Sequence, residues 1–396
     1  MSDTSFVVMV KPVGSACNLS CSYCYYRSPD IDLPVSLSSV RNQQQPTMSG
    51  VTLERLIAEY LAASPDREIS FIWHGGEPTL AGLEFYQQVV RLQERYLQKG
   101  RSCYNNLQTN GILLDDNWCS FLAKHNFGVG LSLDATPEIH DTYRRDRGGN
   151  GSYQASLQAV YRLQRHGIKP DLLCTVTADA AQRPLDAYRS LRDLQTGWIQ
   201  FIPIVRRDLG GDLTPDSVTG EAYGEFLCRV FDEWLLHDFG VTGVQLFAET
   251  MLVAAGGEPS LCWMQASCGR ALIVESDGDI YSCDHFVDSN HFLGFLGSST
   301  TLDAALHHRD QRKFGNVKRD TLPQCCRICD VLLYCHGGCP KDRFPTSSNP
   351  DPDLNVLCTG LHAFFNHAET HLRRLLALRK RNLPDHTIRE LMAKRF

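Results

Sequence analysis

The sequence has no apolar run close to the roughly 20 residues that cross a bilayer, and its first ten residues lack the basic start and long apolar stretch of a secretory signal. We therefore expect a cytoplasmic protein with no membrane partner. A block of Lys and Arg is also missing, because 39 basic residues are spread among 45 acidic ones and the net charge is −6. This balance does not predict a surface that binds nucleic acid.

Cysteine is too sparse for a disulfide scaffold, because 16 of 396 residues is about 4% and such scaffolds exceed roughly 8–10%. It is nevertheless abundant for a reducing compartment, where disulfides are disfavoured. Clustered thiols in such a compartment are more often ligands of a metal or of an iron–sulfur cluster. The remaining composition, 43% hydrophobic and 21% charged, is that of a globular protein and excludes a disordered or collagen-like chain.

Short apolar runs alternate with amphipathic stretches over the first 205 residues, which is typical of βα units around a parallel sheet. We expect strands at residues 6–13, 69–74, 104–109, 128–134, 172–177 and 198–205. Apolar residues at i, i+3 and i+4 predict helices at 53–62, 84–97, 116–124, 153–166 and 185–194. Six units leave a barrel open, so the predicted fold class is α/β, a partial (βα)6 TIM-like barrel with its chemistry at the carboxyl ends of the strands.

The second half of the chain follows a different pattern. A helical stretch at 222–237 leads into a region dense in Cys and Gly from Cys262 onward. Two apolar runs, 272–274 and 280–281, flank the pair Asp277-Gly278 and predict a β-hairpin. Residues 321–352 have little apolar periodicity, so we expect something bound to the cysteines to stabilise them. A closing helix is expected at 361–378.

Three cysteines, Cys17, Cys21 and Cys24, follow the first expected strand with the spacing C-x3-C-x2-C. Structural zinc and electron-carrying [4Fe-4S] centres normally have four protein ligands, so three leave one iron open to a substrate or cofactor. The alternatives are incidental thiols or part of a zinc site. The spacing resembles the signature of radical S-adenosylmethionine (SAM) enzymes. In that family the open iron binds SAM, and one electron cleaves it to methionine and a 5′-deoxyadenosyl radical.

The resemblance continues at the strand ends. Gly75-Gly76-Glu77-Pro78 looks like the GGEP motif of the family, whose backbone and Glu hold the methionine amino group, and glycine allows close backbone approach. Further residues near strand ends are also candidates for contact with SAM, and for each of them the alternative is an ordinary polar residue at the end of a strand. The resemblance implies further contacts with SAM by Tyr23 and Val205 at the adenine, by Arg144 at the carboxylate, and by Gln108, Ser132 and Asp134 at the mouth of the barrel.

Nine cysteines lie from Cys262 to Cys358, in the patterns C-x9-G-x4-C and C-x2-C-x5-C-x3-C. These patterns resemble the SPASM extension of peptide-modifying radical SAM enzymes. Eight of the nine match two four-cysteine [4Fe-4S] clusters, although two structural zinc sites are the alternative. The resemblance implies that auxiliary cluster I is held by Cys262, Cys268, Cys283 and Cys339, and auxiliary cluster II by Cys326, Cys329, Cys335 and Cys358.

Three clusters thus use eleven of the sixteen cysteines. Cys103, Cys119, Cys174 and Cys228 are expected to behave as small buried hydrophobes, and Cys325 is out of register with the ligands. The expected domains are a radical SAM barrel over residues 1–235, a SPASM domain over 236–360 and a helical segment over 361–396.

Within the SPASM group, residues 283–287, 335–343 and 361–365 look like those of the anaerobic sulfatase-maturating enzymes. Such enzymes oxidise a Cys or Ser of an unfolded sulfatase to Cα-formylglycine. The resemblance implies that the deoxyadenosyl radical takes a hydrogen from the target Cβ while a base removes the Sγ or Oγ proton. The second electron then leaves through the auxiliary clusters, and a donor of the flavodoxin or ferredoxin type supplies reducing electrons.

Asp284 is the base that we expect, because it directly follows a cluster I ligand and a carboxylate must lie within hydrogen-bond reach of the proton. The alternative is a solvated Asp at a strand end. Tyr26 and His74 are candidate contacts with the peptide substrate.

Two other functions are weighed. One is maturation of another ribosomal peptide through a thioether or carbon–carbon crosslink, which an apparent lack of a peptide-recognition domain before residue 6 disfavours. The other is non-catalytic electron transfer by a ferredoxin-like protein, against which the three-cysteine motif and GGEP argue.

Overall fold

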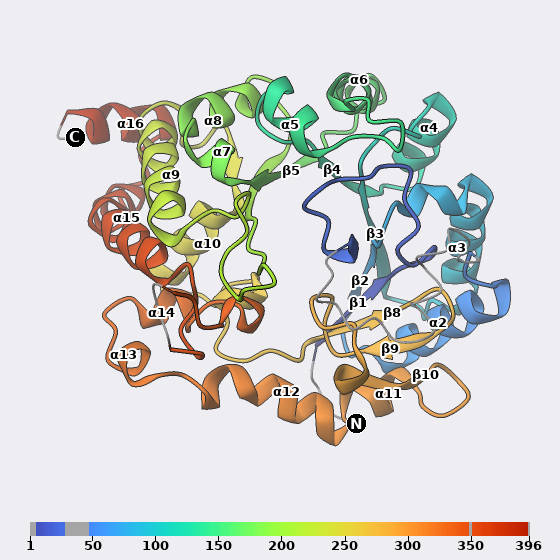
Figure 1. Cartoon of the computed structure of the whole chain (residues 1–396). Coiled ribbons are helices and arrows are strands. Elements are labelled where there is room, and N and C mark those ends of the chain that lie inside the picture. Colours follow the sequence, from blue (N-terminus) through green and yellow to red (C-terminus); the bar gives the residue numbers. More distant parts are fainter. Residues whose placement is uncertain (1–4, 28–46, 348–350, 395–396) are drawn as a thin grey trace. The chain divides into compact units, whose positions relative to one another are not determined.

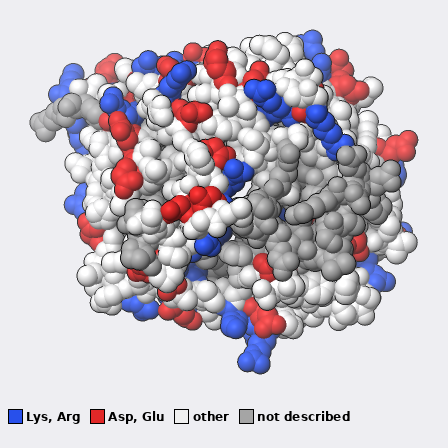
Figure 2. Space-filling model, viewed as in Figure 1, with Lys and Arg blue, Asp and Glu red and all other residues white. Residues whose placement is uncertain are grey.

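The computed structural model describes residues 5–27, 47–347 and 351–394 (Figure 1). The chain forms two compact units. Unit 1 contains residues up to 132 together with 141–170 and 268–317, and unit 2 contains 133–140, 171–267 and 318 onward. Among the described residues, no helix has the length and apolar character needed to cross a membrane. On the face drawn in Figure 2, basic and acidic side chains are interspersed.

The sheet of unit 1 has the strand order β10-β9-β8-β1-β2-β3-β4. Strands β1 to β4 run parallel, as the sequence predicts. The first strand is shorter than expected and ends at Val10 instead of residue 13, because Pro12 has no N–H to continue a ladder. The strands of this unit are β1 (Val7–Val10), β2 (Glu68–Trp73), β3 (Ser102–Thr109), β4 (Gly128–Ser132), β8 (Ala271–Val274), β9 (Asp279–Tyr281) and β10 (Phe292–Phe295).

The β-hairpin expected in the Cys-rich region is confirmed as β8 and β9, which pair antiparallel. Its turn uses Gly278 at φ +95°, a conformation that glycine adopts without a steric penalty. The hairpin also extends the sheet, because β8 pairs in parallel with β1 and Val10 faces Val274. The sequence pattern did not predict this long-range pairing.

Helices follow the strands where the apolar periodicity predicts them. Helix α2 buries Leu53, Leu56 and Ile57 on one face, and the Ser49 side chain caps it by accepting a hydrogen bond from Thr52 N at 3.1 Å. The helices of the first half are α2 (Gly50–Ala63), α3 (Leu83–Tyr96), α4 (Asp116–Lys124), α5 (Pro137–Tyr143), α6 (Tyr153–Arg165), α7 (Ala178–Ala181) and α8 (Pro184–Arg192), with short 3₁₀ turns η1 (Tyr25–Arg27) and η3 (Pro78–Ala81).

Unit 2 holds the parallel strands β5 (Asp171–Val176), β6 (Trp198–Pro203) and β7 (Gly243–Val244). The first two are the remaining strands that the sequence predicts, and β7 is an addition of two residues. The helix expected at 222–237 is found as α9 (Gly220–Glu233), followed by a π-helical turn, η4 (Trp234–Asp238).

The other helices of the second half include several that the sequence did not predict. The described part of residues 321–352 contains only short helical turns. The expected closing helix is α15, which is followed by one more helix. They are α10 (Gln245–Ala254), η5 (Cys262–Met264), η6 (Ser289–His291), α11 (Leu302–Leu306), α12 (Arg309–Asp320), α13 (Gln324–Arg327), α14 (Leu332–Cys335), η7 (Pro340–Asp342), α15 (Cys358–Arg379) and α16 (Asp385–Ala393).

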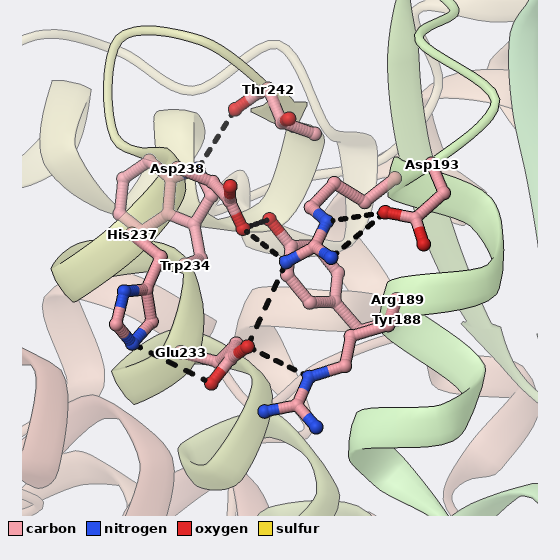
Figure 3. A network of polar contacts seen from close by, with 9 residues as sticks. Tyr188, Arg189, Asp193, Glu233, Trp234, His237, Asp238 and Thr242 are labelled. Carbon is pink, nitrogen blue, oxygen red and sulfur yellow. Dashed lines mark hydrogen bonds and ion pairs between the residues drawn. The ribbon is translucent and has the colours of Figure 1, made fainter.

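Figure 3 shows the polar cluster that links α8 to α9 and η4 within unit 2. The Arg192 guanidinium lies 3.4 Å from Asp238 Oδ2 and 3.7 Å from Glu233 Oε1. The Tyr188 hydroxyl donates a hydrogen bond of 2.8 Å to Asp238. Arg192 thus contacts both carboxylates, and Glu233 is also paired with the Arg189 guanidinium at 2.8 Å. The Arg192 side chain is 25% exposed to solvent.

Helices α9 and α15 lie side by side in unit 2 (Figure 1). Their closest approach is made by glycines, because a Cβ at Gly360 would come within 1.8 Å of Gly220 O and 2.7 Å of Gly224 N. Real Cβ atoms do not approach backbone atoms so closely, so only glycine allows this packing.

Gly360→Ala should therefore destabilise the protein by about 2–3 kcal/mol through overpacking, which lowers the midpoint of thermal unfolding by roughly 5–10 °C. The matched control is Gly50→Ala at the start of α2, where a new Cβ meets only the end of the Gln88 side chain, at 3.1 Å. Thermal melts of both variants measure the difference. Equal midpoints would show that the helices separate at little cost.

Candidate active site

The loop between β1 and η1 carries Cys17, Cys21 and Cys24. Burial, together with the nearby Glu77, Cys21 and Cys24, raises the pKa of the Cys17 thiol to about 12. Such a half-buried thiol is a poor anion by itself, but a cationic iron–sulfur cluster stabilises the deprotonated form. The donor set of this loop therefore fits such a cluster.

The end of β2 is bound to the cysteine loop by backbone hydrogen bonds. Gly76 N donates to Gly14 O and Glu77 N donates to Ala16 O, each at 2.8 Å. A Cβ at Gly76 would lie 2.2 Å from Ala16 O, so this position requires glycine. Gly76 and Glu77 of the motif thus hold the cysteine loop against the sheet.

The Glu77 carboxylate is buried and makes hydrogen bonds within the chain. It accepts from the hydroxyls of Thr79 and Thr109 at 2.5 and 2.7 Å, and from Asn110 N at 2.8 Å. Burial raises its pKa, although these hydrogen bonds to the ionised form oppose the shift. Glu77 therefore joins the ends of β2 and β3, and its expected contact with the SAM amino group stays a prediction.

Four other residues of the expected SAM site belong to unit 1. The Arg144 guanidinium lies 5.4 Å from the centre of the Tyr23 ring, which is within the range of a cation–π contact. Gln108 lies on β3 and forms a side-chain hydrogen bond with His74, and burial lowers the pKa of this histidine. Ser132 is the last residue of β4.

Two more belong to unit 2. Asp134 is buried, and its carboxylate accepts a hydrogen bond of 2.8 Å from Thr175 N on β5. Val205 follows the end of β6. Their contacts with SAM stay predictions.

Asp284 lies in an ion cluster of unit 1 that the sequence did not predict. Its Oδ1 atom is 2.6 Å from the Lys11 ammonium, which is also 3.4 Å from Glu275 Oε1. Tyr25 directly follows Cys24 in the sequence, and its hydroxyl donates a hydrogen bond of 3.3 Å to Asp284. The rings of Tyr25 and Tyr26 lie 5.7 and 4.9 Å from the ammonium. The expected base is thus linked to the cysteine loop through Tyr25.

The electrostatics of this cluster keep Asp284 ionised. Burial alone would raise the pKa of Asp284, but the Lys11 ammonium, and with it His74 and His285, lowers the pKa far below its ordinary value. Burial would likewise lower the pKa of Lys11, yet Asp284 and the other neighbouring acidic groups raise it. Glu275 differs, because burial raises its pKa to about 7 despite the nearby ammonium.

Four cysteines of unit 2, the expected ligands of auxiliary cluster II, line one small cavity. Burial raises the pKa of Cys326 to about 12 and that of Cys358 to about 11, and neighbouring thiols add to both shifts. A set of four clustered thiols fits a [4Fe-4S] cluster or a zinc ion. Cys325 is exposed and does not line the cavity, whose cysteines are Cys326, Cys329, Cys335 and Cys358.

The expected ligands of auxiliary cluster I are divided between the two units. Unit 1 contains Cys268 and Cys283. In unit 2, Cys339 is half-buried with Cys262 nearby, and desolvation raises the pKa of the Cys339 thiol to about 12. The buried Lys318 ammonium donates to the carbonyls of Cys262 and Trp263 at 3.1 and 2.7 Å. This lysine fixes the backbone beside one of the cysteines.

The cysteines left unassigned lie in regular structure. Cys119 on α4 and Cys174 on β5 are fully buried, and Cys103 on β3 and Cys228 on α9 are partly buried.

Sequence reasoning missed Lys11, Glu275 and Tyr25, and it also missed Asn110 as a contact of the cysteine loop. The Asn110 amide donates to Asn18 Oδ1 at 2.7 Å. Lys11 and Glu275 come together through the register of β1 with β8. This register is a property of the fold, and no local sequence motif indicates it.

Known proteins resemble this chain over most of its length. The Radical SAM superfamily profile matches residues 12–179. The serine-type anaerobic sulfatase-maturating enzyme of Bacteroides thetaiotaomicron is 37% identical over 380 residues, which cover 92% of this chain and 90% of that protein. The cysteine-type enzyme of Clostridium perfringens is 31% identical over 372 residues, which cover 91% and 95%.

Solved structures agree with the sequence comparisons. The structure of native anSMEcpe with bound AdoMet and Cp18Cys peptide matches with a TM-score of 0.82 and 28% identity, and covers 93% of this chain and 98% of that one. The fold class predicted from the sequence, an α/β radical SAM partial barrel with a C-terminal extension, is thereby confirmed. The alternative of a non-catalytic electron carrier, which the sequence motifs disfavour, is not supported by these relatives. The chain belongs to the radical SAM superfamily and, within it, to the anaerobic sulfatase-maturating enzymes.

Proposed function

We propose that this enzyme converts a Ser or Cys side chain of a sulfatase polypeptide to Cα-formylglycine. The observation that carries the proposal is the position of Asp284. Its carboxylate accepts a hydrogen bond from Tyr25, the residue that directly follows Cys24, and its side chain is 16% exposed. A carboxylate beside the cysteine loop has the charge and the access needed to take a proton from a bound peptide.

SAM supplies the radical in this reaction, and side chains of the protein bind the substrate and accept its proton. When bound, SAM and its reduced cluster supply the radical that takes a hydrogen atom from the target Cβ. Asp284, ionised by its contact with Lys11, accepts the Sγ or Oγ proton, and the electron left on the substrate passes to an auxiliary cluster. A Ser side chain thereby becomes the aldehyde directly, whereas the thioaldehyde formed from Cys reacts with water and releases hydrogen sulfide. Tyr26 and His74 contact the peptide. Residues proposed to hold SAM are Tyr23, Gly75, Gly76, Glu77, Gln108, Ser132, Asp134, Arg144 and Val205.

We further propose that the chain binds three [4Fe-4S] clusters, one through Cys17, Cys21 and Cys24 and two through the eight auxiliary cysteines. The support is the clustering of thiols, most of them half-buried, in the first loop and around the cavity of unit 2. Because thiolate ligands need a reducing compartment, we place the enzyme in the cytoplasm, with a donor of the flavodoxin or ferredoxin type. The division into domains at residues 235 and 360 is proposed on the same ligand pattern.

The proposed function is tested by anaerobic incubation with SAM, a reductant and two sulfatase peptides that carry Cys or Ser at the target position. Mass spectrometry should detect formylglycine in at least one peptide, together with released 5′-deoxyadenosine. Cleavage of SAM with no change in either peptide would exclude the proposed activity.

Asp284→Asn should lower formylglycine formation by the roughly 10² to 10⁴ that general-base catalysis contributes, because an amide cannot accept the proton. The fold should persist, since Glu275 still faces the Lys11 ammonium. With the Cys peptide the loss should shrink between about pH 7 and 9.5, as a thiol with a pKa of about 8.5 ionises unaided.

The measurement is product formed per 5′-deoxyadenosine released, for both peptides across that pH range. The Ser peptide serves as the control, because its hydroxyl does not ionise there. Wild-type yield from the Asn variant at neutral pH would exclude Asp284 as the base.

Cys326→Ala should lower the iron content from about twelve to about eight atoms per chain and reduce the soluble yield, because metal binding stabilises a segment with little core of its own. The matched control is Cys325→Ala, since Cys325 is exposed and lies outside the cavity. Iron analysis and expression yield are the measurements. Equal losses of iron and yield in the two variants would mean that the assignment of Cys326 rather than Cys325 as a cluster ligand is wrong.

A further inference from the structure

Strand register brings two oppositely charged side chains together inside unit 1. Strands β1 and β8 run parallel with Val10 opposite Val274, and Lys11 N donates to Val274 O at 2.9 Å. The next residues along the two strands are Lys11 and Glu275. Their proximity follows from backbone pairing and does not depend on a flexible loop.

The three members of the cluster differ in their access to solvent. The side chains of Lys11 and Glu275 are 0% and 1% exposed, whereas that of Asp284 is 16% exposed. Among the described residues, the Glu275 carboxyl forms an ion pair with the Lys11 ammonium and has no other hydrogen-bond or ion-pair partner. Only the Asp284 side chain can therefore contact a bound peptide, because those of Lys11 and Glu275 are enclosed by the protein.

A buried ammonium is not explained by stability alone. Moving a charge out of water is costly, and replacing a buried ion pair by apolar side chains is often neutral or stabilising. The Lys11 ammonium is nevertheless enclosed by two carboxylates and two tyrosine rings. Of the two carboxylates, the nearer one belongs to the residue proposed to take the substrate proton.

We propose that Lys11 is a positioning residue for formylglycine formation: its buried ammonium holds the Asp284 carboxylate in the orientation that faces the target side chain. The inference rests on the proposed function. Glu275 provides a second negative group for the ammonium from β8. Tyr25 completes the arrangement by donating to Asp284 from the side of the cysteine loop.

The reason why orientation matters is geometric. A base must lie within about 3 Å of the proton that it removes, and a misplacement of about 1 Å can reduce the rate by 10²-fold. Asp284 follows β9 on an irregular segment, so its backbone alone leaves the carboxylate free to rotate. The contact of 2.6 Å with the ammonium removes that freedom.

The first test is Lys11→Gln in the full-length, cluster-loaded enzyme. Formylglycine formed per 5′-deoxyadenosine released should fall by roughly tenfold or more, with kcat lowered and the peptide KM little changed, because binding does not use the buried lysine. Glu275→Gln should keep the ratio within about threefold, since an amide oxygen still accepts from the ammonium. A loss in Glu275→Gln as large as in Lys11→Gln would overturn the role assigned to Lys11.

A second variant covers the case in which Lys11→Gln does not fold. Lys11→Met combined with Glu275→Gln removes one cation and one carboxyl together, so that the buried net charge of the cluster is unchanged when Glu275 is ionised. The ratio should fall as in Lys11→Gln. A crystal structure of this double variant should show the Asp284 carboxylate turned away from its present position, and an unmoved carboxylate would overturn the proposal.

The matched control is Arg192→Gln, which removes the cation that contacts both Glu233 and Asp238 in the cluster of unit 2 shown in Figure 3 and leaves Glu233 paired with Arg189. Thermal stability should fall, and the ratio of product to 5′-deoxyadenosine should stay at the wild-type value. An equal fall of the ratio would mean that it follows general destabilisation, which would overturn the proposal.

The outcomes separate this inference from the proposed function. If the wild-type enzyme forms no formylglycine from either peptide, the proposed function fails and the role of Lys11 fails with it. If the wild-type enzyme forms product and the Lys11 variants keep its ratio, only the role of Lys11 is excluded.

Discussion

The parallel pairing of β1 with β2 on one side and β8 on the other is the constraint on which the site of unit 1 depends. Parallel strands end at the same edge of a sheet, so the residues that follow them meet there. The cysteine loop follows β1, Gly75 and Gly76 follow β2, and Glu275 follows β8. Backbone hydrogen bonds from Gly76 and Glu77 to residues 14 and 16 then fix the loop against this edge.

Charge burial at this edge is balanced locally. Glu77 has its oxygens satisfied by Thr79, Thr109 and Asn110, which join the ends of two strands. Lys11 instead binds carboxylates, one of which is partly exposed. The two acids therefore differ. Buried Glu77 accepts hydrogen bonds from neutral donors and joins the ends of two strands, whereas Asp284 is paired with a cation and its side chain stays partly exposed.

The Cys-rich part of unit 2 depends on a different kind of stabilisation. The described residues between α12 and α15 form only short helical turns, and a small cavity there is lined by four cysteines, of which Cys326 is buried and the others are half-buried. A segment with so few apolar side chains gains little from burial, so that metal binding would supply part of its folding free energy. The glycine contact between α9 and α15 gives the same unit a tightly packed region that needs no ligand.

The sequence by itself determined the six strands of the barrel, most of their helices, the β8–β9 hairpin and the cysteine motifs, because each depends on residues close together in the chain. Periodicity, turn residues and ligand spacing are local signals. The ends of β1 and the extra helix α16 were less well predicted, since proline termination and packing override a simple apolar pattern.

The tertiary structure alone decided how the site is held. Lys11 and Glu275 are separated by more than 260 residues, and nothing near either of them in the sequence indicates a partner. Only the register of two strands from distant parts of the chain brings them together and places Asp284 against the same ammonium. The sequence shows which charged residues are present. The free energy of burying a charge depends, however, on the opposite charge beside it, and the fold decides which charge that is.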